Sequence, residues 1–396
     1  MRRMRGFLGG GVLLLAGLAA PTGAVPGAVA AELGGGIRLV EVSPPARGLQ
    51  LDQLSERGHV TLWGLEDGRY RAYRWHRGEI TEIDPGAARN TSTTAMNRRG
   101  VVAGTTSDAS GDPASWEGFT WSDGVMTAVP DRPGGSAAQD VDDHGRVLVN
   151  RYTAETGRWR TSVLDGDREI TIPDVAGVGP IGGTEMNNRG QVIGSLRTAD
   201  LAYRSYLWRP GRRPVDLGSL GGTQTVASEI NEAGTVLGYG FTAGDAEERN
   251  FLWRRGRMID LGTLGGAGSP LNFPNSGRPD LLNERDEVAG SSFTASGDMH
   301  AFFWSDGHMQ DLGTLGGNYS GAAGINDRGE VSGVSSTAAG EFHGFLWRDG
   351  TMIDLGPLTG SPFSMAWPIN DRGQVAGIHH SDAGAGVVLW ETRGRN

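Results

Sequence analysis

The feature that most constrains this chain is a sequence that returns at a nearly fixed interval. One copy, residues 300–317, reads His-Ala-Phe-Phe-Trp-Ser-Asp-Gly-His-Met-Gln-Asp-Leu-Gly-Thr-Leu-Gly-Gly, and close copies begin at Asn250 and His343. A second motif, Ile-Asn-Asp-Arg-Gly-Glu-Val-Ser-Gly at residues 325–333, precedes the copies in variant forms. A repeat of ~40–50 residues is typical of proteins that build one four-stranded sheet from each unit.

The Asn of the second motif marks eight units, whose markers lie 42 to 52 residues apart. The markers are Ser55, Asn97, Asp142, Asn187, Asn231, Asn283, Asn326 and Asn370. The repeat therefore predicts an all-β fold, a β-propeller of about eight four-stranded blades.

Turn signals in each unit support four short strands. Asp349-Gly350, Asp306-Gly307 and Asp123-Gly124 each separate two apolar segments, and Asp-Gly suits the two positive-φ positions of a type I′ hairpin. Pro210-Gly211 must turn differently, because proline cannot adopt a positive φ. The Asn-Asp-Arg-Gly motif predicts a turn in which the Asn side chain bonds the backbone ahead of it.

A tryptophan recurs in the third strand of seven units, and this pattern indicates core packing between neighbouring sheets. The third unit departs most from the pattern, because Leu164 replaces the Trp and the Asp-Leu-Gly segment is lost, which puts its blade geometry in question. The Trp positions are Trp75, Trp121, Trp208, Trp253, Trp304, Trp347 and Trp390.

The last unit ends soon after Trp390 and lacks its final strand, while residues 37–44 at the other end of the chain resemble that strand. We expect this N-terminal strand to complete the last blade and close the ring, which removes exposed sheet edges. An open solenoid is the alternative. Residues 31–36, Ala-Glu-Leu-Gly-Gly-Gly, are expected to be a flexible lead-in.

Residues 1–30 have the features of a secretory signal peptide: three arginines, an apolar segment from Phe7 to Ala20, and Ala28-Val29-Ala30 as a cleavage site. We expect residues 31–396 to form a single secreted, extracellular domain without a membrane span, and to be monomeric. The formal net charge of -10 argues against binding to nucleic acid. The chain has no cysteine and no lysine, which excludes thiolate metal sites, a cysteine nucleophile and Schiff-base chemistry.

These motifs together resemble the bacterial HAF-repeat family, described as a probable extracellular repeat. The resemblance is closest over residues 187–358 and weakest in the third unit. It implies a secreted protein built from repeats, and it implies no particular activity.

Candidate ligand residues are sought where the repeats differ. An insertion follows the fifth marker and contains Asn272, Phe273, Asn275 and Arg278, while Trp63, Trp116, Trp159 and Trp367 lie outside the repeated Trp position. Aromatic side chains with polar neighbours are suited to stacking on sugar rings. From this set we predict ligand binding by the four insertion residues together with Trp116 and Trp367.

Aligned acids are the candidate metal ligands. Asp216, Asp260, Asp311 and Asp354 occupy one position of their units, so in a ring they would lie at equal radius and be able to bind calcium. The alternative is that each carboxylate caps its own Leu-Gly turn. The sequence predicts no other cofactor.

Three functions remain open from the sequence. The first is a non-enzymatic binding or scaffold propeller that recognises an extracellular glycan or protein. The second is a secreted glycan-cleaving hydrolase or lyase with acids and arginines at a central channel. The third is a structural surface component. No catalytic sequence motif selects the second.

Overall fold

The computed structural model describes residues 30–33, 37–43, 48–86, 89–130, 134–175, 179–198, 202–270, 280–356, 363–381 and 384–392. The expected signal peptide lies outside these residues except for Ala30. Within the described ranges, no helix is long and apolar enough to cross a membrane.

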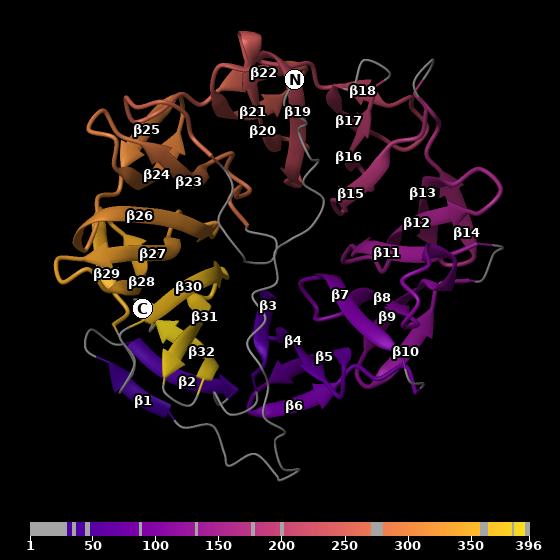
Figure 1. The fold of residues 1–396 in the computed structure, drawn as a ribbon, viewed down its shortest axis with the longest axis horizontal. Helices are drawn as coiled ribbons and strands as arrows, with labels where there is room; N and C mark the ends of the chain where they lie inside the picture. The colour runs from indigo at the N-terminus through magenta and orange to yellow at the C-terminus, as the bar shows by residue number, and fades with distance from the viewer. Residues whose placement is uncertain are drawn as a thin grey trace, which may run out of the picture.

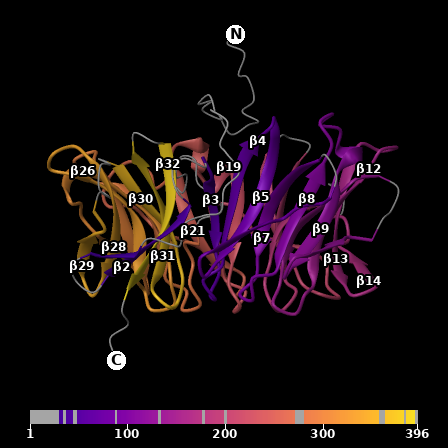
Figure 2. The ribbon, with the colours of Figure 1, turned by 90° about the horizontal axis from the view of Figure 1, so that it is seen from below.

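The described strands form antiparallel sets that follow one another along the chain and lie around a common centre (Figure 1). Seen from the side, the strands run between the two faces of a disc (Figure 2). The first three sets are β3 (Gln50–Leu54), β4 (Val60–Glu66), β5 (Arg69–His76) and β6 (Glu79–Glu82); β7 (Asn90–Met96), β8 (Val102–Ser107), β9 (Glu117–Ser122) and β10 (Val125–Ala128); and β11 (Ser136–Val141), β12 (Val147–Thr153), β13 (Arg158–Asp165) and β14 (Arg168–Thr171).

The next sets follow the same order. They are β15 (Gly182–Met186), β16 (Val192–Arg197), β17 (Tyr203–Trp208) and β18 (Val215–Asp216); β19 (Gly221–Ile230), β20 (Val236–Thr242), β21 (Glu248–Arg254) and β22 (Arg257–Asp260); β23 (Val288–Phe293), β24 (Met299–Ser305) and β25 (His308–Asp311); and β26 (Gly316–Ile325), β27 (Val331–Thr337), β28 (Phe342–Arg348) and β29 (Thr351–Asp354). In the set with β23, Leu282 pairs with Val288 as an isolated bridge. Two short 3₁₀ helices, η3 (Pro113–Ser115) and η4 (Ala243–Asp245), connect strands.

The last set joins the two ends of the chain. It contains β30 (Phe363–Ile369), β31 (Gln374–Ser381) and β32 (Gly384–Thr392), and β2 (Ile37–Ser43) pairs antiparallel with β32. The expected N-terminal strand is therefore present in the last sheet. β1 (Ala30–Leu33) pairs in turn with β2, so the expectation of a flexible lead-in is wrong for residues 31–33, which extend the sheet edge instead.

The predicted hairpins are confirmed. Asp123, Asp306 and Asp349 have φ values of 50°, 49° and 51°, and the glycine after each also has a positive φ. At Pro210-Gly211 the chain turns with a hydrogen bond from the Arg212 N–H to the Arg209 carbonyl and a positive φ only at the glycine. That geometry is a type II turn, which accepts proline at its second position.

The repeated tryptophans lie in the core, as predicted: all seven are at most 8% exposed. Successive residues of a strand point to opposite faces of the sheet. Apolar residues at neighbouring strand positions therefore pack against the sheets on both sides. Leu164 fills the same position in the third unit at 8% exposure, and β11 to β14 form a complete four-stranded sheet. The loss of the motif in this unit therefore does not disrupt its sheet.

Candidate functional sites

The marker turns connect the first and second strands of the sheets, and their Asn side chains bond the local backbone as predicted. In the turn of Asn326, the side-chain Oδ1 accepts the N–H groups of Arg328 and Glu330, both at 3.0 Å. Asn97, Asn187, Asn283 and Asn370 repeat this arrangement. Each of these five turns is thus fixed by one buried amide, which satisfies N–H groups that would otherwise lack partners.

The other end of the same amide bonds the next sheet, which the sequence did not reveal. The Nδ2 of Asn326 donates to the carbonyl of Asn370 at 3.1 Å, and the Nδ2 of Asn370 donates to the carbonyl of Ser55 at 3.0 Å. The second bond joins residues 315 positions apart. Further bonds of this kind link Asn97 to Asp142, Asn187 to Asn231, Asn231 to Asn283 and Asn283 to Asn326.

The residue after each marker adds a second series of bonds between sheets. The side chain of Asp371 accepts the N–H of Asp327 at 2.8 Å, and Glu56 accepts the N–H of Asp371 at 3.0 Å. The same pattern runs through Asp143, Asn188, Glu232, Glu284 and Asp327. Arg98 occupies this position in the second unit and carries no acceptor, so the series is interrupted there.

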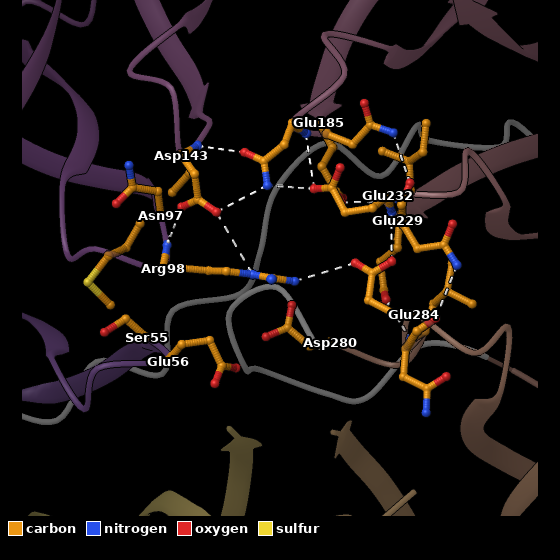
Figure 3. Close-up of a pocket in the computed structure, with 18 of the residues that line it drawn as sticks. Ser55, Glu56, Asn97, Arg98, Asp143, Glu185, Glu229, Glu232, Asp280 and Glu284 are labelled. Atoms are coloured by element: carbon orange, nitrogen blue, oxygen red, sulfur yellow. Dashed lines mark hydrogen bonds and ion pairs between the residues drawn. The ribbon is translucent and has the colours of Figure 1, made fainter. Parts of the chain in front are cut away.

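These turns surround an axial cavity of about 290 Å³ that is strongly acidic (Figure 3). Arg98 reaches across it, with its guanidinium 3.5 Å from Glu284 and 4.0 Å from Asp143. It is the only basic residue among the described residues that line the cavity. The eleven acids of the lining are Glu56, Asp140, Asp142, Asp143, Glu185, Glu229, Glu232, Asp280, Glu284, Asp327 and Asp371.

Burial and mutual repulsion raise the pKa of several of these acids. Burial, and next the charge of Asp371, raise the pKa of Glu56 to about 7. Burial raises the pKa of Glu229 well above its usual range, and the charges of Glu185 and Asp280 add to this rise. The cavity therefore holds protons at a pH where exposed carboxylates are ionised.

This proton uptake predicts a pH dependence of stability. Glu56 in the folded state binds its proton more tightly than in the unfolded state, so its contribution is fully present below pH 4.5 and is lost as pH rises through about 7. We expect the free energy of unfolding to fall less between pH 5 and 8 in E56Q than in the native protein, measured by urea titration. E155Q, which changes an exposed acid in the β12–β13 hairpin, should follow the native curve. Parallel curves for the native protein and E56Q would contradict this assignment.

A cluster of three aromatic rings lies at the opposite ends of the strands from the marker turns. Trp116 precedes β9, while Tyr152 and Trp159 face each other across the β12–β13 hairpin. The ring centroids of Trp116 and Trp159 are 5.5 Å apart, and those of Tyr152 and Trp159 are 5.3 Å apart. All three side chains are partly exposed, so their rings form an aromatic surface that we call the aromatic platform.

The backbone around the aromatic platform is closely packed. Trp116 accepts the N–H of Ser136 at 2.8 Å, and Gly135 accepts the N–H of Tyr152 at 2.7 Å. A Cβ atom at Gly135 would overlap the carbonyl oxygen of Pro113 in η3. These backbone contacts join the two sheets that carry the platform.

The predicted ligand residues meet different outcomes. Trp116 belongs to the aromatic platform. Trp367 is only 8% exposed and belongs to the same core cluster as Ile378, so the structure places it in the core and not on an open surface. It lies in the part of β30 where the register with β31 shifts, between Ala366 and Ile369. Asn272, Phe273, Asn275 and Arg278 lie outside the described residues.

The structure does not bring the predicted metal ligands together. Asp216, Asp260, Asp311 and Asp354 belong to the last strands of four different strand sets. Each Oδ1 accepts the N–H of the glycine two residues later, at 2.7 to 2.8 Å. Turn capping, the alternative raised from the sequence, therefore accounts for their recurrence. Among the described residues, no group of three or more His, Asp or Glu side chains is placed to hold one metal ion.

Sequence reasoning missed the axial acids and Tyr152. The acid after the marker recurs in six of the eight units, but the turn alone seemed to explain it. The acids two residues before the marker, Asp140, Glu185 and Glu229, occur in consecutive units. Only the arrangement of the strands around a common centre shows that these positions face one cavity.

Comparisons with known proteins support the fold. No family model matches the chain, and no curated protein matches it. A puromycin-hydrolysing peptidase from Mycobacterium tuberculosis is similar at 14% identity and a TM-score of 0.50, over 84% of this chain and 58% of that one. The β-propeller domain of the trilobed protease from Pyrococcus furiosus is similar at 12% identity and a TM-score of 0.48, over 78% of this chain and 97% of that one. An acylaminoacyl peptidase from Pyrococcus horikoshii is similar at 13% identity and a TM-score of 0.48, over 86% of this chain and 59% of that one. The chain thus spans less than two thirds of the length of the peptidases from Mycobacterium tuberculosis and Pyrococcus horikoshii. At 14% identity, the similarity to the Mycobacterium tuberculosis peptidase concerns the fold alone.

Proposed function

We propose that this chain is a secreted, non-enzymatic β-propeller that binds an extracellular glycan through the aromatic platform. The observation that carries the proposal is the contact of Trp116, Trp159 and Tyr152 on one partly exposed surface. Aromatic rings bury much area at little conformational cost, and their faces suit the C–H groups of a sugar ring. Arg158, exposed beside Trp159, offers donors to sugar hydroxyls.

The proposal includes eight blades closed into a ring and membership of the HAF-repeat family. The pairing of β2 with β32 supports closure, as does the bond from the Asn370 amide to the Ser55 carbonyl. The eight markers support the blade number, and the repeated motifs support the family. Secretion is inferred from the arginine-rich, apolar residues 1–30.

The test is binding of extracellular polysaccharides to the native protein, followed by isothermal titration with whichever polysaccharide raises the unfolding temperature. W159A and W116A should each weaken binding by about tenfold, because a stacked ring contributes on the order of 1 kcal/mol beyond its buried area. V125A removes an exposed apolar side chain in β10, 64% exposed, and should bind normally. Native affinity in both tryptophan variants would reject the platform as the site.

A glycan-cleaving enzyme is the second candidate, favoured by the carboxylates and Arg98 in the axial cavity. Hydrolysis requires two carboxylates about 5–10 Å apart on either side of the bond. Most of these carboxylates accept backbone N–H groups and so have a structural role in the turns. This favours glycan binding at the aromatic platform over catalysis in the cavity. New reducing ends released from the bound polysaccharide would support the enzyme.

A further inference from the structure

An aromatic side chain recurs at one further position of the repeat, five residues before the buried Trp of the third strand, or before Leu164 in the third unit. This position lies at the start of the third strand. Because the marker turn joins the first strand to the second, the third strand starts at the opposite ends of the strands, on the face of the aromatic platform. The aromatic residues at this position are Tyr70, Trp116, Trp159, Tyr203 and Phe342.

These rings are open to solvent. Tyr70, Tyr203 and Phe342 are 41%, 41% and 39% exposed, and Trp116 and Trp159 are partly exposed. A large exposed apolar side chain is ordinary when it stands alone, but a set that recurs on one face marks a contact surface.

The third strand forms without a ring at this position. Glu248, Met299 and Ala385 occupy it in the fifth, sixth and eighth units. Their strands β21, β24 and β32 nevertheless pair antiparallel with the strand before them, as in the other units. The recurring rings are therefore not a requirement of the sheet.

Four of the rings belong to consecutive units, the first to the fourth. Their third strands, β5, β9, β13 and β17, follow one another around the common centre (Figure 1). At one end, the ring centroid of Trp63 lies 6.0 Å from that of Tyr70. At the other end, the guanidinium of the exposed Arg197 lies 5.8 Å from the ring centroid of Tyr203. The aromatic platform is thus the middle of a longer row, which we call the aromatic arc: Tyr70, Trp116, Trp159 and Tyr203.

We propose that one linear polysaccharide binds along the aromatic arc, with several of its sugar residues stacked on the rings. This inference rests on the function proposed above and specifies its ligand as an internal segment of a long chain. A polysaccharide repeats its sugar faces as the arc repeats its rings, and the tyrosine hydroxyls and Arg197 offer hydrogen bonds to sugar hydroxyls. Affinity should rise with chain length, because each further contact along one chain is intramolecular.

The test is isothermal titration of the native protein with xylan, hydroxyethyl cellulose, glycol chitin and alginate, followed by size-selected fragments of each polysaccharide that binds. A fragment of about twelve sugars should bind at least tenfold more tightly than the disaccharide. Y70A and Y203A should each weaken binding of the long fragment about fivefold, because each removes one stacking contact. Both variants should bind the disaccharide as the native protein does, since the aromatic platform holds it.

Two kinds of control keep the result specific to the arc. Y70F and Y203F keep the rings and should retain most of the affinity. F342A removes a similarly exposed ring from the same repeat position outside the arc, and should bind the long fragment normally. The unfolding temperature of each variant should stay near the native value, because the substituted side chains are exposed.

The outcomes separate the arc from the platform. Equal affinity for the disaccharide and the long fragment, with a loss in W159A but none in Y70A and Y203A, would overturn the arc and leave the platform as the site. A loss in F342A as large as that in Y203A would also overturn the arc, because it indicates general adhesion to exposed rings. Failure of all four polysaccharides to bind would overturn the arc together with the proposed function.

Discussion

Removal of residues 1–43 is expected to leave a protein that unfolds or aggregates near room temperature. β2 contributes Ile37, Val40 and Val42 to the core, exposed by 4%, 7% and 2%. Burial of three such side chains is worth about 5–9 kcal/mol, which is comparable with the whole stability of a typical domain, about 5–15 kcal/mol. The loss also uncovers the edge of β32, which becomes a template for association.

The measurement is the unfolding temperature and the sedimentation behaviour of the shortened chain. Removal of residues 1–33 takes away β1 but keeps β2, so it is the matched control and should change little. A synthetic peptide of residues 30–43 added to the shorter protein should restore folding by pairing with β32. A shortened chain that unfolds at the native temperature would show that the N-terminal strand does not stabilise the fold.

Replacement of Asn370 by alanine should destabilise the protein by about 3 kcal/mol. The side chain is 1% exposed and donates to the Ser55 carbonyl and to Gln374 Oε1, while its own oxygen accepts the N–H groups of Arg372 and Gln374. Alanine leaves these buried groups without partners, at about 1–3 kcal/mol for each that stays unsatisfied. Urea unfolding gives the loss directly.

Two further variants separate the local role of Asn370 from the one between sheets. N370D keeps the oxygen that closes the turn but places a second acceptor opposite the Ser55 carbonyl. It should therefore lose stability too; native stability in N370D would mean that only the local turn matters. R372A removes an exposed side chain of the same turn and should change the free energy of unfolding by less than about 0.5 kcal/mol.

The marker turn shows which of its contacts can be predicted from the repeated sequence and which cannot. The Asn-Asp-Arg-Gly sequence predicts the turn, since the Asn Oδ1 needs only N–H groups two and four residues away. The partner of its Nδ2 lies in the next sheet, 43 to 52 residues on, or 315 residues back from Asn370 to Ser55. No local rule gives that contact, because it depends on how adjacent sheets are rotated.

The candidate sites illustrate the same division. Aligned aspartates such as Asp311 are candidate metal ligands in the sequence, with turn capping as the alternative, because a ring places equivalent residues at equal radius. They lie on the last strands of different strand sets, which keeps them apart. Trp367 lies outside the repeated position, yet it is buried in a core cluster at a point where the register of β30 shifts. Trp116 and Trp159 were recognised as exceptions, and only the packing of two sheets brought them into contact.

By itself the sequence determined the strands, the hairpins, the buried tryptophans and the position of the N-terminal strand in the last sheet. These depend on short periods and on turn residues with fixed φ, which act over a few positions. Tertiary structure decided which acids face the axial cavity and which aromatic side chains come into contact in the aromatic platform. Glu185, Glu229 and Asp280 become one acidic surface only when separate units converge, because their mutual repulsion and burial exist only in the folded protein.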